Sequence, residues 1–189
     1  MTTGAALQKE GVELFMQRDY EAAAEKFKAA QTAYESEQKP DMGQEMLVNL
    51  ALIEQRMGNH EQAVQMMGEA RSFFASAGDR TREAMVIGNL GGAYEAMGNT
   101  EQAVTFFREA ADSLRELGDM PRYGETLLHI AGIQLKSGKL MQAAATYEVA
   151  LENIEDLNFR QKAMKALLGL KNRLTGTGLP PEEKEEKKD

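Results

Sequence analysis

The heptapeptide GNHEQAV at residues 58–64 recurs as GNTEQAV at residues 98–104, an offset of 40 residues. A further step of 40 residues places Gly138 and Ala143 at the matching positions, and a step backwards leads to RDYEAA at residues 18–23. No copy needs a gap to match the next. The sequence therefore contains four copies of one unit, and such internal repetition is typical of a solenoid.

Small and large apolar residues also recur at fixed positions of this unit. One position is small in every copy and another is large and apolar: the small residues are Gly11, Ala51, Gly91 and Ala131, and the large ones are Phe27, Met67, Phe107 and Tyr147. Helices that pack closely need a small side chain where they cross and a large one to fill the space alongside. The two columns therefore predict a pair of closely packed helices in each copy.

Helical spacing supports two helices per unit. In the third copy, apolar or small residues follow the i, i+3, i+4, i+7 pattern of one helix face: Ile87, Leu90, Gly91 and Tyr94. Gly98 can take the left-handed conformation that ends a helix. Asn99, followed three residues later by Gln102, is typical of the start of the next helix.

These residues resemble the tetratricopeptide repeat, in which a small residue, an aromatic, a Gly-Asn or Gly-Asp turn and an alanine occur at such spacings. The 40-residue unit, with NLG at 89–91 before Tyr94 and Gly118-Asp119 between pairs, is similar to the extended repeats of Pins-type polarity adaptors and kinesin light chains. The resemblance covers residues 5–157. It implies an all-α, right-handed solenoid of four helix-turn-helix repeats.

The copies and the change of composition after them predict the domain organisation. We expect an array over residues 5–174, made of repeats at 5–38, 44–78, 84–118 and 124–157 and a C-terminal capping helix at 159–174. In that helix Ala163, Leu167, Leu170 and Leu174 are expected to face inward. Residues 175–189 begin with Thr-Gly-Thr-Gly and end in a run of charges without an apolar residue, which predicts a disordered tail.

Composition limits the partners and the chemistry. The 189 residues carry a net charge of −8 and no cysteine, which disfavours nucleic acid and anionic membranes as partners. The N-terminal residues do not resemble a signal peptide, so a cytoplasmic location is expected. The two histidines, His60 and His129, are far apart in sequence, and the glycine-rich residues 88–92 lack the ending of a phosphate-binding loop. We therefore expect no enzyme activity, no catalytic or metal site and no cofactor.

The first helices of the repeats carry a polar column that suggests a binding groove. Asn49, Asn89 and His129 each lie one residue before a buried aliphatic residue, and asparagines lie in a similar place in Pins-type repeats. The predicted groove residues are Asn49, Leu52, Arg56, Met85, Asn89, Gly92, Glu125, His129 and Lys136. An amide both donates and accepts hydrogen bonds, which suits the main chain of an extended peptide. Ordinary solvated residues on a helix surface would give the same pattern.

The expected function is that of a protein–protein interaction scaffold or adaptor that holds a peptide or protein segment in the concave groove. Two alternatives stay open at this point. One is a structural protein that self-assembles through its N-terminal end, where Leu7, Leu14 and Phe15 are expected to be available for association. The other is a regulatory subunit of an enzyme complex.

Overall fold

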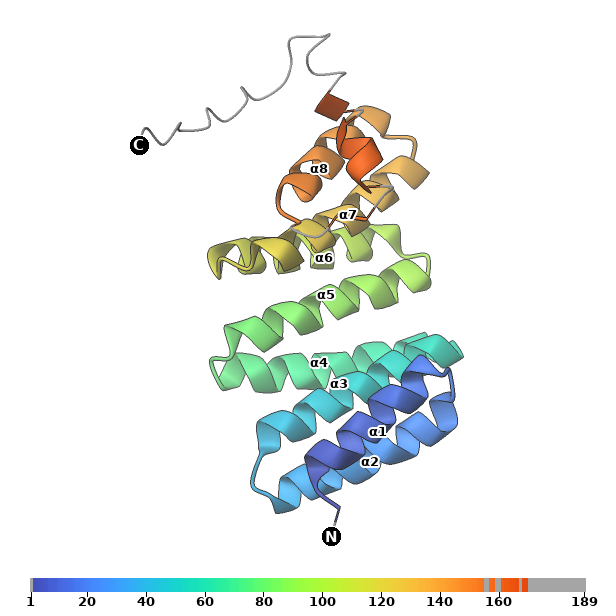
Figure 1. Ribbon diagram of the computed structural model, residues 1–189, viewed down its shortest axis with the longest axis vertical. Helices are drawn as coiled ribbons and strands as arrows, with labels where there is room; N and C mark the ends of the chain where they lie inside the picture. The colour runs from blue at the N-terminus through green and yellow to red at the C-terminus, as the bar shows by residue number, and fades with distance from the viewer. Residues whose placement is uncertain (1, 155–156, 159–160, 167, 170–189) are drawn as a thin grey trace, which may run out of the picture.

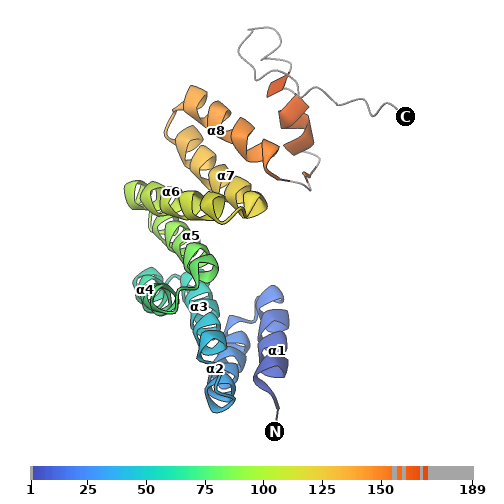
Figure 2. The same ribbon diagram turned by 90° about the vertical axis from the view of Figure 1, so that its left-hand side faces the viewer.

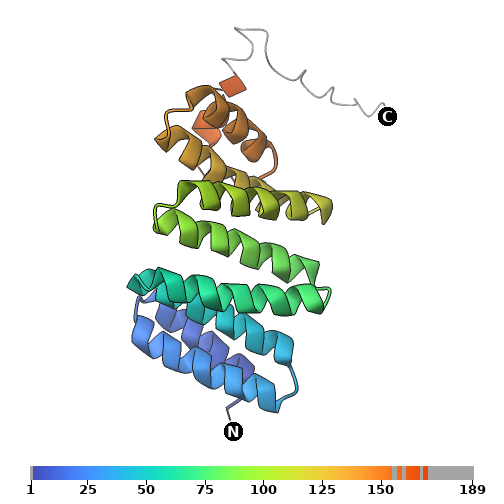
Figure 3. The same cartoon turned by 180° about the vertical axis from the view of Figure 1, so that it is seen from behind.

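The computed structural model describes residues 2–154, 157–158, 161–166 and 168–169, and it shows helices stacked along one long axis (Figure 1). The view from behind shows the same layers (Figure 3). In chain order the helices are α1 (Gly4–Met16), α2 (Tyr20–Ser36), α3 (Pro40–Met57), α4 (His60–Ser76), α5 (Arg80–Ala96), α6 (Thr100–Glu116), α7 (Met120–Lys136) and α8 (Leu140–Glu152).

Neighbours in sequence are also neighbours in space. Each helix packs chiefly against the helices before and after it, and α3 additionally contacts α5. Figure 2 shows α4 end-on and α6 more nearly side-on, so the helix axes turn along the stack. This is an all-α solenoid of helix pairs, as the repeat predicts, in which each unit is stabilised by its neighbours.

A left-handed residue ends a helix every 20 residues. Five of these residues are glycines with φ between 69° and 89°: Gly58, Gly78, Gly98, Gly118 and Gly138. Arg18 and Gln38 take the same conformation in the first copy. In this turn the backbone N–H of the following residue donates to a carbonyl of the helix that ends, as Asn99 N does to Tyr94 O at 2.9 Å. Asn99 then begins α6, because its Oδ1 accepts from the Gln102 amide at 3.2 Å, which confirms the predicted cap.

The small and large columns meet inside each helix pair. A Cβ atom at Gly91 would lie 2.8 Å from Cδ1 of Phe107, and one at Gly11 would lie 2.8 Å from Cδ1 of Phe27. Both rings are buried, so neither can move aside freely. Where the large residue is Met67 or Tyr147, the small position holds alanine instead. At Gly11 and Gly91 the backbone of the first helix therefore approaches a buried phenylalanine ring, for which the missing Cβ leaves room.

The apolar residues at the N-terminal end pack inward. Leu7, Leu14 and Phe15 lie against the cluster formed by buried residues of α2 and α3, including Phe27 and Leu50. All three are only partly buried, and association through the N-terminal end stays a prediction. The large apolar residues of α1 that are exposed are Val12 and Met16, on the other side of the helix.

After α8 the structure describes helical residues at 161–166 and 168–169. Leu168 is buried, and Nζ of Lys165 donates to the carbonyl of Leu151 at 3.0 Å, near the end of α8. Ala163 is exposed rather than inward-facing among the described residues, so the expectation that it faces inward is wrong. The rest of the predicted capping helix at 159–174, and the predicted tail at 175–189, lie outside the described residues.

Tyr34 closes the first helix pair. Its ring occupies the space beside Gly4, where a Cβ atom would lie 2.6 Å from Cδ1, and its hydroxyl donates to Oε1 of Gln8 at 2.5 Å. Burial raises the pKa of Tyr34, and the nearby carboxylates of Glu37 and Glu45 raise it further. The fold therefore requires the neutral phenol at this position.

Gly91→Ala and Gly92→Ala form a matched pair that tests the packing rule. Both changes favour a helix by about 1 kcal/mol, but only at Gly91 does the new methyl meet a buried ring, at an overpacking cost of about 1–3 kcal/mol. The nearest atom to a Cβ at Gly92 is Nε2 of Gln55, 3.9 Å away. We expect Gly91→Ala to lower the free energy of unfolding by up to about 2 kcal/mol and Gly92→Ala to raise it, as measured by urea denaturation. Equal effects would contradict the rule.

Alkaline pH should destabilise the protein through Tyr34. Because its pKa is raised in the folded state, the contribution to stability is complete below about pH 10, the usual pKa of tyrosine, and is lost as pH rises through the folded-state pKa. Urea midpoints measured from pH 9 upward should fall more steeply for the natural protein than for Tyr34→Phe. Lysines titrate in both proteins, so parallel curves would exclude this role for Tyr34.

Candidate functional site

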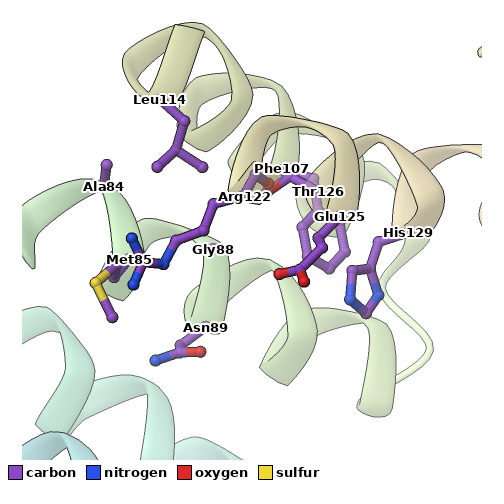
Figure 4. Close-up of a pocket in the computed structure, with 10 residues that line it drawn as sticks. All are labelled: Ala84, Met85, Gly88, Asn89, Phe107, Leu114, Arg122, Glu125, Thr126 and His129. Carbon is purple, nitrogen blue, oxygen red and sulfur yellow. Dashed lines mark hydrogen bonds between the residues drawn. The ribbon is translucent and has the colours of Figure 1, made fainter. Parts of the chain in front are cut away.

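A cavity of about 210 Å³ lies between α5, α6 and α7 (Figure 4). Its polar lining comes from two successive repeats, with Asn89 on α5 and Arg122, Glu125 and His129 on α7. Apolar lining comes from residues that include Met85 on α5 and Phe107 on α6. The cavity therefore combines an amide, a carboxylate, a guanidinium and an imidazole with a partly apolar wall.

Phe107 connects this cavity to the core. One edge of its ring lies against Gly91, and the ring stacks on the imidazole of His129 with centroids 4.8 Å apart and an interplanar angle of 11°. Nδ1 of His129 also lies 3.8 Å from Oε2 of Glu95. Because the ring is buried and the histidine is not, the core fixes the orientation of a side chain that remains accessible to a ligand.

Arg82, at the start of α5, shows how the repeats are joined electrostatically. Its Nε lies 2.6 Å from Oε1 of Glu45, and its Nη1 lies 3.0 Å from Asp41 and 3.1 Å from Asp79. Its guanidinium also stands over the ring of Phe74, 5.7 Å from the centroid. Burial by itself lowers the pKa of Arg82, but Glu45, Asp41 and Asp79 outweigh it and raise that pKa. Arg82 thus binds carboxylates of two successive repeats.

Arg122 occupies the same position one repeat later but has different neighbours. It keeps the ion pair with Asp119 that corresponds to Arg82–Asp79. The residues that correspond to Asp41 and Glu45 are Thr81 and Met85, neither of which carries a charge. Within the described residues, Asp119 is the one carboxylate in ion-pair contact with Arg122, and the side chain is 50% exposed, against 30% for Arg82.

Four of the nine residues predicted for the groove meet in this cavity: Met85, Asn89, Glu125 and His129. The other five lie outside it. Asn49, Leu52 and Arg56 belong to α3, and Leu52 is half-buried against the neighbouring core cluster. Gly92 lies beside Gln55 of α3. Lys136 pairs with Glu95 at 2.8 Å, so its charge is already balanced within the protein. That all nine contact a partner stays a prediction.

Sequence reasoning missed the other six residues of the cavity, which are Ala84, Gly88, Phe107, Leu114, Arg122 and Thr126. The repeat pattern places Phe107 in the core, and the ring is indeed buried there. For Arg122 a signal was present in the repeat itself: the arginine recurs after 40 residues, whereas its acidic partners Asp41 and Glu45 do not. A basic residue that recurs without its partners is a candidate for binding something else.

Two other kinds of site are absent from the part of the chain that the structure describes. No helix there is long and apolar enough to cross a membrane. In the same residues no group of three or more His, Asp or Glu side chains is arranged to hold a metal ion.

The sequence of residues 44–116, which spans the second and third copies, matches the tetratricopeptide repeat family. These two copies are matched as tetratricopeptide repeats. The match agrees with the stacked helix pairs of this region, and solenoids of this kind present extended surfaces for binding other proteins. Among curated proteins, none matches the sequence.

Solved structures share the fold. BtubC (BKLC) from P. vanneervenii superposes with a TM-score of 0.72 at 17% identity, over 92% of this chain and 74% of that one. Aspartyl phosphate phosphatase F from Bacillus subtilis superposes with a TM-score of 0.75 at 15% identity, over 93% of this chain and 45% of that one. A tetratricopeptide repeat protein from Parabacteroides merdae ATCC 43184 superposes with a TM-score of 0.54 at 20% identity, over 92% of this chain and 62% of that one. The chain thus spans less than two thirds of the length of the latter two, and the likeness concerns the fold alone.

Because the two arginines have different neighbours, we expect their substitution to lower the free energy of unfolding by different amounts. Arg82→Gln leaves Asp41, Glu45 and Asp79 without their shared cation, and we expect a loss of about 1–2 kcal/mol because several charges form one network. Arg122→Gln removes one exposed ion pair and should cost less than about 0.5 kcal/mol. Urea unfolding followed by circular dichroism measures both. Similar losses would mean that Arg122 is as much a structural residue as Arg82.

Proposed function

We propose that this chain is a protein-interaction scaffold that binds an extended peptide segment along α3, α5 and α7, without catalytic activity of its own. The observation that supports this most directly is the cavity between α5, α6 and α7, where Asn89 and His129 of successive repeats line one space. On this proposal the cavity holds one side chain of the segment, and the main chain runs along the helices beside it.

The size of the cavity favours a side chain over a small molecule. Pockets for small ligands usually enclose about 300–1,000 Å³, whereas this cavity measures about 210 Å³. Such a volume suits one amino-acid side chain. A segment that places a side chain here gains specificity at one point and leaves its main chain for contacts elsewhere.

The recurrence of Asn49, Asn89 and His129 supports main-chain recognition. The three residues occupy the same position in successive copies, on α3, α5 and α7. Both asparagines are half-buried, which restricts their rotamers without removing them from contact with a ligand. A side-chain amide pairs with a peptide N–H and C=O at the same time, so the column offers one such contact per repeat.

Self-assembly is a second candidate, favoured by a separate observation. Leu135, Leu140 and Met141 are exposed around the turn between α7 and α8, where the preceding copy has Glu95, Thr100 and Glu101. Met16 is exposed on α1. Exposed apolar residues near both ends are compatible with contacts between copies. A regulatory subunit of an enzyme complex would use the same surfaces as a scaffold.

The proposal is tested with a displayed library of random nonapeptides selected on the immobilised natural protein. Asn49→Leu/Asn89→Leu removes the amides and keeps their size, so we expect selected peptides to bind about ten-fold or more weakly, the effect of losing one or two hydrogen bonds. Fluorescence anisotropy measures the affinities. In ¹⁵N spectra the selected peptides should shift the side-chain amide of Asn89.

Gln65→Leu is the matched control, because Gln65 is exposed on α4 and outside the cavity. It should bind the peptides as the natural protein does. If both variants bind equally well, the groove assignment is wrong. Sedimentation velocity then tests self-assembly, which Leu140→Glu/Met141→Glu should abolish.

A further inference from the structure

We infer that the cavity between α5, α6 and α7 selects an acidic side chain of the bound segment, whose carboxylate pairs with the guanidinium of Arg122. This inference rests on the proposed function, since it names the chemistry of the residue that enters the cavity. It depends on a comparison within the chain, between two arginines at the same position of successive repeats.

Arg82 shows which groups this position of the repeat binds. Two carboxylates of the preceding repeat approach it, Glu45 at 2.6 Å and Asp41 at 3.0 Å, and a third comes from Asp79 at its own helix start. A planar guanidinium with five donors is suited to several carboxylate oxygens at once. The fold therefore presents this arginine to carboxylates that lie beside the preceding helix pair.

At Arg122 the carboxylates from the preceding repeat are replaced by the neutral residues Thr81 and Met85. Met85 lines the cavity. In Figure 4 the Arg122 side chain extends from α7 toward Met85 and Asn89 of α5. The side of the guanidinium that corresponds to the Glu45-binding side of Arg82 thus faces the cavity, and a ligand carboxylate there takes the role that Glu45 has one repeat earlier.

The other groups of the cavity define where the carboxylate fits. Asn89 lies on the same side as the guanidinium, and its amide can donate to the second carboxylate oxygen. Glu125 and His129 lie on the opposite side in Figure 4, and among the described residues Glu125 forms no ion pair with Arg122. Because Glu125 repels a second negative charge, the cavity accepts one acidic residue and disfavours a run of them.

Two libraries test the inference. Both consist of nonapeptides with random flanks, and they differ only at the fixed central residue, which is glutamate in one and glutamine in the other. The natural protein should retain the glutamate library about ten-fold better at low salt, as expected for a charge-assisted bidentate contact. The preference should decrease as salt is added, because the ion pair is partly exposed. Equal retention of the two libraries would overturn the inference.

Three variants test which residues cause the preference for the glutamate library. Arg122→Gln should abolish this preference. The substitution leaves the start of α7 intact, because Asp119 accepts a hydrogen bond from the backbone amide of residue 122. Met85→Glu should abolish the preference too, since the new carboxylate would pair with Arg122 as Glu45 pairs with Arg82. Met85→Gln, of the same size without the charge, should retain it. Preserved glutamate preference in Arg122→Gln or in Met85→Glu would contradict the assignment.

Asn89→Leu separates this inference from the proposed function. It should weaken binding of both libraries, whereas Arg122→Gln should weaken binding of the glutamate library alone. If Asn89→Leu weakens both and Arg122→Gln leaves the preference intact, peptide binding stands and the role of Arg122 is wrong. If Asn89→Leu leaves the binding of both libraries unchanged, the cavity is not the peptide site, and the proposed function fails with the inference.

Discussion

The contact between the ring of Phe107 and the backbone at Gly91 sets the geometry on which the cavity depends. Because glycine has no Cβ, α5 approaches the buried ring closely enough that any larger residue would clash. The same ring stacks on His129 of the next repeat. One aromatic side chain therefore fixes both the packing within a helix pair and the position of an accessible group between pairs, so core and candidate site are continuous.

Residues that recur in every repeat and residues that depart from the repeat have different roles in this molecule. Positions that recur in every copy, such as the small and large columns, maintain the packing of helix pairs. Arg82 and Arg122 also recur, but one is surrounded by carboxylates of the chain and the other borders a cavity. Since each repeat of a solenoid contacts only its neighbours, a pair of substitutions at Thr81 and Met85 can change one surface without disturbing the rest of the array.

Part of the candidate site could be predicted from the sequence, because the repeats are equally spaced. Equal spacing places Asn49, Asn89 and His129 at equivalent positions on successive helices, and Met85 and Glu125 one turn earlier. It does not say which equivalent positions share a space, because that depends on how far the helix axes turn from one pair to the next. Hence Asn89 and His129 meet in the cavity while Asn49 does not. The inward packing of Leu7, Leu14 and Phe15 depended in the same way on neighbours that spacing does not reveal.

By itself the sequence determined the class of fold and the order of its helices, because repeat period, turn glycines and helix caps act within about 20 residues of chain. Only the tertiary structure decided what each charged residue faces. The partners of Arg82 lie 37 and 41 residues earlier in the sequence, on the preceding helix pair. Their approach depends on the rotation between pairs, which follows from the packing of rings such as Phe107 on small residues. In the same arrangement Arg122 keeps its ion pair with Asp119 but meets Met85 and the cavity where Arg82 meets Glu45.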